Sequence, residues 1–347
     1  MKKIKPERKY LRIFQNILAV AITLGLIIYL IFRFNPTQII EAITRLSAWP
    51  IVSVILIMVT LFLLKILRWH FILHKLNIRI SILKTTELVL IGAFGASVTP
   101  AKVGDVVRAY YLSKWTDTKE TTSFFSAILD RIMDLISIGF FALIAFPFFI
   151  TQLDRITKWS LVSGLILILI ITILMFNSQI IKKIVKLLVN IRNRKEKSNQ
   201  ETSAKKENET IYDNSKSIKI VEDYYSNLAY FKTRDYLLVI FITFAFWMLL
   251  GLQVGVLISS MAEIYLTFQI LLTIAGIMSI AAIVSLIPIS ISGIGIRDAT
   301  ITLLIFYSLQ IGTEIAFSAS LIQTALNMLI PGVIGGVILL LRRRRKK

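Results

Sequence analysis

Residues 50–74 read PIVSVILIMVTLFLLKILRWHFILH, an apolar run in which Lys65 and Arg68 are the only Lys, Arg, Asp or Glu residues. About 20 apolar residues cross the roughly 30 Å hydrocarbon core of a bilayer as one α-helix. A run of this length and composition therefore predicts a transmembrane helix. The same pattern recurs, and five further full-length spans are predicted at 12–33, 123–150, 159–177, 236–260 and 314–341.

The composition of the whole chain supports the class of integral membrane proteins. Of the 347 residues, 56% are hydrophobic and only 17% are charged, and the mean hydropathy is +0.75. In soluble domains about a quarter of the residues are charged. The net charge is +20, and the basic residues gather in blocks beside apolar runs, which indicates contact with a membrane surface rather than with nucleic acid. Without cysteine and with only two histidines, we expect no metal site and no cofactor.

The distribution of basic residues predicts the orientation. Cytoplasmic loops of membrane proteins carry an excess of Lys and Arg. By this rule the N-terminus, the loop 178–235 and the tail 342–347 lie on the cytoplasmic side of the plasma membrane. The loop is predicted to be partly disordered, over 192–217, because that stretch is polar. The connections 34–49, 151–158 and 261–266 are predicted to be short and external.

Two further apolar segments, 81–113 and 267–310, are interrupted by Pro and Gly. The orientation requires each of them to begin and end on the same side of the membrane. Each is therefore a re-entrant hairpin or a pair of full spans. Both alternatives return the chain to the side from which it entered, so the orientation does not distinguish between them.

The two interrupted segments resemble each other. Residues 99–108 read TPAKVGDVVR and residues 287–298 read IPISISGIGIRD. Each combines a Pro that ends a helix, a Gly that permits a sharp reversal, and then an Arg close to an Asp. Since they enter from opposite sides, we expect an inverted-topology repeat, whose broken helices meet near the middle of the membrane and form a transport site.

The predicted fold is therefore all-α, with about six transmembrane helices and two re-entrant hairpins in one polytopic membrane domain. Its parts are a first half at 12–177 with the broken segment 81–113, the charged loop 178–235, a second half at 236–341 with the broken segment 267–310, and the basic tail 342–347, all within 1–347.

The two breaks contain the candidate binding residues. A helix that restarts after a break points its N-terminus, with partial positive charge, toward that break. Arg108 and Arg297 lie within about the first turn of such helices, and a guanidinium group can bind a phosphate through two parallel hydrogen bonds. The predicted site for a lipid or another anion consists of Pro100, Gly104, Arg108, Pro288, Gly293, Gly295 and Arg297.

Charged residues within the spans predict a polar groove. Asp130 and Asp134 are four residues apart and share one face of their helix. Such residues face the interior of a bundle, where these two would balance Arg108 and Arg297, meet a cationic head group, or form a structural ion pair. Trp69 is predicted to lie in the interfacial aromatic belt. The predicted groove comprises Arg68, Asp105, Asp130, Arg131, Asp134 and Asp298.

Four stretches carry a family resemblance: residues 90–94, 99–112, 126–134 and 288–298. Together they resemble the lysylphosphatidylglycerol synthase transmembrane family, over about residues 12–341. The resemblance implies a flippase-like membrane domain that moves phospholipids, aminoacylated or not, between leaflets. Its implied partners are anionic or aminoacylated phospholipids and a separate lipid-modifying enzyme. The aminoacyltransferase domain of bifunctional members is expected to be absent, because the chain ends at Lys347 soon after the last span.

Two other functions remain open at this point. The chain has no P-loop, no H-E-x-x-H and no G-x-S-x-G motif, so we predict no catalytic residues and no catalytic domain. The first alternative is nevertheless an enzyme, a phosphatidylglycerol lysyltransferase or an enzyme or subunit of a glycosyl-lipid pathway. The second is an ion or solute transporter on an inverted-repeat fold. A homo-oligomer is also left open.

Overall fold

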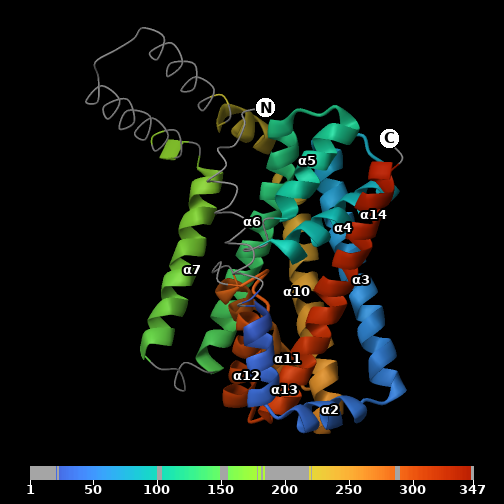
Figure 1. Ribbon diagram of the computed structural model, residues 1–347. Helices are drawn as coiled ribbons and strands as arrows, with labels where there is room; N and C mark the ends of the chain where they lie inside the picture. The colour runs from blue at the N-terminus through green and yellow to red at the C-terminus, as the bar shows by residue number, and fades with distance from the viewer. Residues whose placement is uncertain are drawn as a thin grey trace, which may run out of the picture.

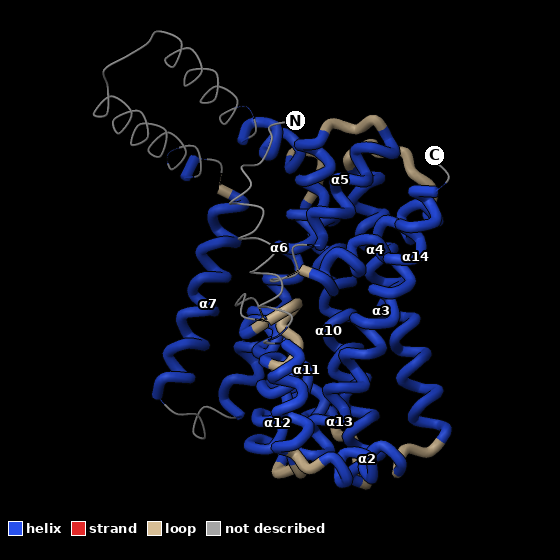
Figure 2. Tube along the Cα trace, in the orientation of Figure 1, coloured by secondary structure: helices blue, strands red, loops and turns tan. Residues whose placement is uncertain are grey.

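The computed structural model describes residues 21, 23–99, 104–148, 155–177, 179–180, 183, 219, 221–285 and 290–344. Within these ranges the chain forms helices joined by short connections, as predicted (Figure 2). The sequence reason is the long apolar runs, whose backbone groups can be satisfied inside a bilayer only by helical hydrogen bonds or by a closed barrel.

The helices of the first half follow a helix over 23–33. They are α2 (Pro36–Thr44), α3 (Ala48–Lys75), α4 (Ile82–Val98), α5 (Gly104–Thr116), α6 (Glu120–Ala145) and α7 (Arg155–Phe176). Those of the second half are α10 (Thr233–Ala262), α11 (Phe268–Val284), α12 (Ile296–Leu309), α13 (Thr313–Thr324) and α14 (Ile330–Arg344). A π-helical turn, Ala325–Leu329, joins α13 to α14.

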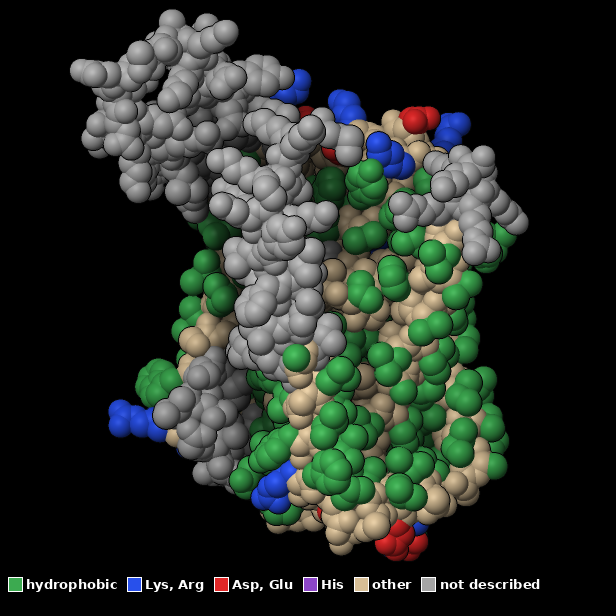
Figure 3. Space-filling model, viewed as in Figure 1, with side chains coloured by type: hydrophobic (Ala, Val, Ile, Leu, Met, Phe, Trp, Pro, Cys, Tyr) green, Lys and Arg blue, Asp and Glu red, His purple; other side chains and the backbone are tan. Residues whose placement is uncertain are grey.

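Three helical stretches are long and apolar enough to cross a bilayer: Ala48–Lys75, Thr233–Ala262 and Thr313–Arg342. They coincide with the predicted spans 50–74, 236–260 and 314–341. Helices α6 and α7 occupy the predicted ranges 123–150 and 159–177, and the number of six spans stays a prediction. On the visible face, hydrophobic side chains cover the sides of the bundle and most charged ones lie toward its two ends (Figure 3).

The stretch 34–49, predicted as a simple external connection, contains a helix. The helix over 23–33 and α2 meet at an angle of 81°. Asn35 caps α2, since its Oδ1 accepts a hydrogen bond from the N–H of Thr37 at 3.2 Å, and Pro36 occupies the first helical position. Helix α2 lies across one end of the bundle, opposite the end marked by the N and C labels (Figure 1).

Each interrupted segment forms two helices, α4 with α5 and α11 with α12. In the first pair the contacts run antiparallel: a Cβ on Gly104 would overlap the backbone of Gly95 and Ala96, and a Cβ on Gly92 would lie 3.3 Å from Cβ of Arg108. Helix α5, with 13 residues, is about 20 Å long, which is shorter than the roughly 30 Å core of a bilayer. Its length favours a re-entrant hairpin over a full span.

The two hairpins lie at opposite ends of the bundle, with α4 and α5 near the end that carries the N and C labels and α11 and α12 near the other (Figure 1). Helices of the two halves also interleave, since α10 packs on α3, α11 on α6 and α14 on α4. Small residues permit these close approaches. A Cβ on Gly276 would overlap Ala145, and one on Gly335 would overlap the carbonyl of Leu90.

The described part of the loop 178–235 contributes to the packing. Residues 221–228 are helical. The ring centroids of Tyr224 and Phe125 of α6 lie 4.9 Å apart. The hydroxyl of Tyr225 donates a hydrogen bond to the carbonyl of Leu174 in α7 at 2.9 Å. The stretch 192–217, predicted to be disordered, lies outside the described residues.

Candidate functional site

An ionic network joins α3, α5 and α6 inside the bundle. The carboxylate of Asp130 lies between two guanidinium groups, 2.6 Å from Nε of Arg68 and 2.5 Å from Nη2 of Arg108. Arg68 Nη1 also donates to Asp134 Oδ1 at 2.7 Å and to Thr243 Oγ1 at 2.9 Å. The side chains of Arg108 and Asp130 are 0% and 1% exposed. Arg68 is thus paired, where the sequence left its role open.

Helix α5 positions Arg108 through two neighbours. Gly92 of α4 leaves room for the stem of the arginine, and the guanidinium carbon lies 4.5 Å from the centre of the Trp69 ring. The indole N–H of Trp69 donates to Ser126 Oγ at 3.3 Å. The prediction that Trp69 lies in an interfacial belt is therefore wrong, because its ring is fully buried beneath a cation.

Positive charge is in excess around the network. Arg131 Nη1 lies 3.4 Å from Asp134 Oδ2, and Lys65 lies within electrostatic range of both carboxylates. Counting only described arginine side chains, three guanidinium groups (Arg68, Arg108 and Arg131) face two carboxylates (Asp130 and Asp134), which leaves one positive charge in excess. The side chain of Asp105 lies outside the described residues.

A second cluster lies at the start of α12. Asp298 Oδ1 accepts hydrogen bonds from Ser320 Oγ at 2.5 Å and Thr324 Oγ1 at 2.8 Å, and its Oδ2 accepts from the N–H of Gly295 at 2.9 Å. Arg297 Nη2 donates to Thr324 Oγ1 and lies 3.5 Å from Asp298 Oδ1. Asp298 therefore caps α12 and binds the arginine beside it.

Glycine is required in the turn before α12. Gly293 and Gly295 have φ angles of +77° and +86°, which residues with a Cβ atom rarely adopt. A Cβ on Gly293 would overlap Ser285, and one on Gly295 would lie 2.7 Å from Cδ2 of Leu26 in the helix over 23–33. The predicted sharp reversal is thus present here, although Pro288 lies outside the described residues.

The π-helical turn follows the second cluster directly. Within it, Asn327 Nδ2 donates to Gln253 Oε1 at 2.5 Å, and Gln253 Nε2 donates to the carbonyl of Val54 at 3.0 Å. These amides link α10, α3 and the last span, as expected for polar residues at helix interfaces. A π-helical turn within a helix often marks a functional site.

The comparison with known families concerns nearly the whole chain. The family profile described as "Lysylphosphatidylglycerol synthase TM region" matches residues 16–336. The chain belongs to this family. A UPF0104 membrane protein of Methanocaldococcus jannaschii is 23% identical over 342 residues, which cover 95% of this chain and 93% of that protein. A UPF0104 membrane protein of Pyrococcus horikoshii is 24% identical over 334 residues, covering 94% of this chain and 97% of the relative.

The matched range of the lysylphosphatidylglycerol synthase membrane region contains both clusters. The structure brings Arg68, Arg108, Asp130, Arg131 and Asp134 together in the first cluster. Arg297, Asp298 and Gly295 form the second. Among the described side chains, Asp130 and Asp134 pair with cations of the first cluster only. The carboxylate that pairs with Arg297 is that of Asp298, so the expectation that Asp130 and Asp134 balance Arg297 is wrong. Pro100 and Pro288 lie outside the described residues.

Sequence reasoning missed four polar partners of these clusters. They are Thr243, Ser126, Ser320 and Thr324, each a hydroxyl in an apolar helix. Such residues are frequent in transmembrane helices, where they also bond to their own backbone. Their presence in the sequence therefore did not distinguish them from ordinary packing residues.

Proposed function

We propose that this member of the lysylphosphatidylglycerol synthase membrane-region family translocates a phospholipid, with or without an aminoacylated head group, between the leaflets of the plasma membrane. One observation carries the proposal: the buried network around Arg108, in which the described arginines outnumber the described carboxylates. Charged side chains inside a bilayer are costly and usually mark a pathway for a substrate or an ion. An excess of positive charge favours an anionic substrate, and the lipid phosphate is the anion that the bilayer itself supplies.

The proposed step is an exchange of ion pairs. Arg108 now binds Asp130, which also binds Arg68. A lipid phosphate would replace Asp130 as the partner of Arg108, while Asp130 keeps Arg68. The guanidinium group thereby regains a charge-assisted partner, which offsets part of the cost of breaking its bond to Asp130. Because Arg108 is fully buried, α5 and α6 must separate before a phosphate can enter, with the acyl chains remaining in the lipid.

The second cluster gives the proposed pathway its other end. Arg297 and Arg108 both follow a break that contains proline and glycine, and both lie near the start of a short helix, the two helices being at opposite ends of the bundle. We take these segments as the two members of an inverted repeat, one opening toward each side of the membrane. The basic N-terminus, the loop 178–235 and the basic tail then lie in the cytoplasm. A separate enzyme would attach the head group.

The test measures lipid flipping in proteoliposomes. Fluorescent phosphatidylglycerol and its lysylated form are placed in both leaflets, and an added reductant quenches the outer leaflet. The wild-type protein should expose the inner-leaflet label to quenching. Arg108→Ala and Arg297→Ala should slow flipping at least roughly tenfold, the effect of losing one charge-assisted contact. Arg33→Ala serves as the matched control, because Arg33 is exposed at the end of the helix over 23–33.

Three results would contradict the proposal. Flipping that persists in correctly folded Arg108→Ala and Arg297→Ala proteins would make both clusters purely structural. Aminoacyl-lipid formed from aminoacyl-tRNA by the purified chain would support the lysyltransferase alternative. A current or a solute flux that needs no lipid substrate would support the ion or solute transporter.

A further inference from the structure

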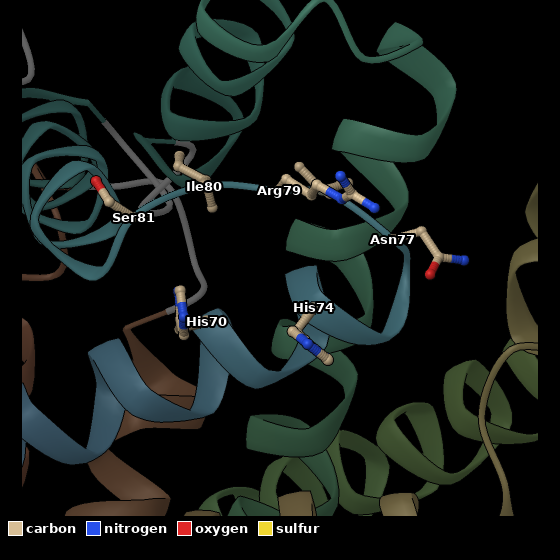
Figure 4. A pocket seen from close by; sticks show the side chains of 7 residues that line it. His70, His74, Asn77, Arg79, Ile80 and Ser81 are labelled. Atoms are coloured by element: carbon tan, nitrogen blue, oxygen red, sulfur yellow. The ribbon is translucent and has the colours of Figure 1, made fainter.

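A cavity of about 790 Å³ opens where α3 turns into α4. Figure 4 shows two histidines on α3 and, beside them, the connecting segment that leads to α4. The ionic network around Arg108 and the Arg297 cluster contribute none of the residues described as lining this cavity. Its lining residues are His70, His74, Asn77, Ile78, Arg79, Ile80 and Ser81.

The backbone around the cavity is held by a helix cap. Asn77 adopts a left-handed conformation with φ of +58°, which ends α3. The N–H of Ile78 donates to the carbonyl of Leu73 at 3.0 Å, and the N–H of Asn77 donates to that of His74 at 3.0 Å. Ile78 is 5% exposed and belongs to the hydrophobic core, so the connection is anchored. A ligand would therefore meet a preformed site.

The lining of the cavity suits an anion. Arg79 and His74 are exposed at its wall, and among the described side chains Arg79 has no carboxylate within salt-bridge distance. None of the described residues that line the cavity is acidic. Ser81 is the N-cap of α4, so the positive end of that helix dipole also lies at the wall.

An adjoining cavity of about 640 Å³ is more apolar. It shares His70, His74 and Asn77 with the first and adds Leu67, Phe71 and Lys75. Lys75 is already paired with Asp235 at 2.8 Å. From Leu67 the exposed apolar face of α3 continues to Leu63, and both leucines are about half exposed on the side of a membrane-spanning helix. A ligand that fills both cavities has an anionic head and an apolar tail.

We propose that this corner between α3 and α4 binds an anionic phospholipid. The phosphate lies against Arg79 and His74, and an acyl chain follows Leu67 and Phe71 toward the bilayer. The apolar wall next to the basic one favours a lipid over a free phosphate ion. This is a surface site for a bound lipid, separate from the buried pathway proposed for translocation.

The experiment uses the full chain in detergent micelles and measures binding by native mass spectrometry and by the shift of the thermal midpoint. The probes are dihexanoyl phosphatidylglycerol, dihexanoyl phosphatidylcholine and inorganic phosphate. All proteins carry Arg108→Ala, so that the buried site cannot contribute. The variants are Arg79→Ala combined with His74→Ala, and the matched control Arg33→Ala.

Phosphatidylglycerol should bind the Arg108→Ala protein, and the Arg79 and His74 changes should weaken this binding at least roughly tenfold. Arg33→Ala should leave it unchanged, and phosphatidylcholine should bind more weakly than phosphatidylglycerol. Equal affinity of phosphatidylglycerol for the variant and its parent would overturn the proposal. So would binding of inorganic phosphate with no binding of phosphatidylglycerol, since the ligand would then be a soluble anion. Flipping by the wild-type protein is measured separately, so either proposal can fail alone.

Discussion

Replacing Asp130 with Asn should destabilise the protein, because its carboxylate is a shared partner within the first cluster. The carboxylate joins two guanidinium groups, at 2.6 Å from Arg68 and 2.5 Å from Arg108. Arg68 keeps a second carboxylate, Asp134, at 2.7 Å. Arg108 would keep its contact with Trp69 and lose the bond to Asp130.

The expected cost follows from these contacts. Breaking a buried ion pair by removing the charge of one member costs about 3–5 kcal/mol. Asp134 still pairs with Arg68, and the Asn side chain can still accept one hydrogen bond. We therefore expect a loss of unfolding free energy at the lower end of this range, about 3 kcal/mol. That corresponds to a factor of roughly 150 in the folding equilibrium. Adding Arg108→Gln should recover much of this loss, because the buried cation is then removed as well.

The assay is equilibrium unfolding in mixed micelles, with sodium dodecyl sulfate as denaturant and circular dichroism as readout. The matched control is Asp117→Asn, the same chemical change at an exposed residue with a φ of +50° that Asn accepts readily. A loss for Asp130→Asn no larger than that for Asp117→Asn would refute the account of the network. Additive effects of the Asp130 and Arg108 changes would refute their direct coupling.

Two further predictions concern packing and capping. Gly104→Ala should cost at least about 2 kcal/mol and separate α4 from α5, because the new methyl group overlaps the backbone of Ala96. Gly25→Ala, with open space around its Cα, should cost nothing in the same unfolding assay. Ser320→Ala removes one of the hydroxyl donors to the buried carboxylate of Asp298 and should cost about 1–3 kcal/mol of unfolding free energy; a loss no larger than that of Gly25→Ala would contradict this role.

The sequence predicted the long helices well, because the length of an apolar run decides them. Helix α3 spans Ala48–Lys75 where 50–74 was predicted, and α10 spans Thr233–Ala262 where 236–260 was predicted. Helix α6 ends at Ala145 rather than at 150, since Pro147 cannot continue an α-helix and lies in a short 3-10 turn. Helix α2 was missed because nine residues are too few for a span, although Asn35 and Pro36 are a readable helix start.

The candidate site was predictable only in part. The spacing of Asp130 and Asp134 placed both on one helix face, and the breaks near Gly104 and Gly295 indicated short helices with an arginine near the start. The choice of partners was not predictable. Arg68 and Asp134 are 66 residues apart in the chain, so their contact depends on how α3 packs against α6, which no local pattern encodes.

The pairing between α3 and α6 has a consequence for how the protein enters the membrane during synthesis. A helix that carries two aspartates at its centre inserts poorly alone, at a cost of about 2.5–3.5 kcal/mol for each aspartate. Besides Arg131 of α6 itself, the cations that pair with them reside on α3 and α5, which leave the ribosome earlier. We therefore expect α6 to insert more readily once α3 and α5 are available to pair with it.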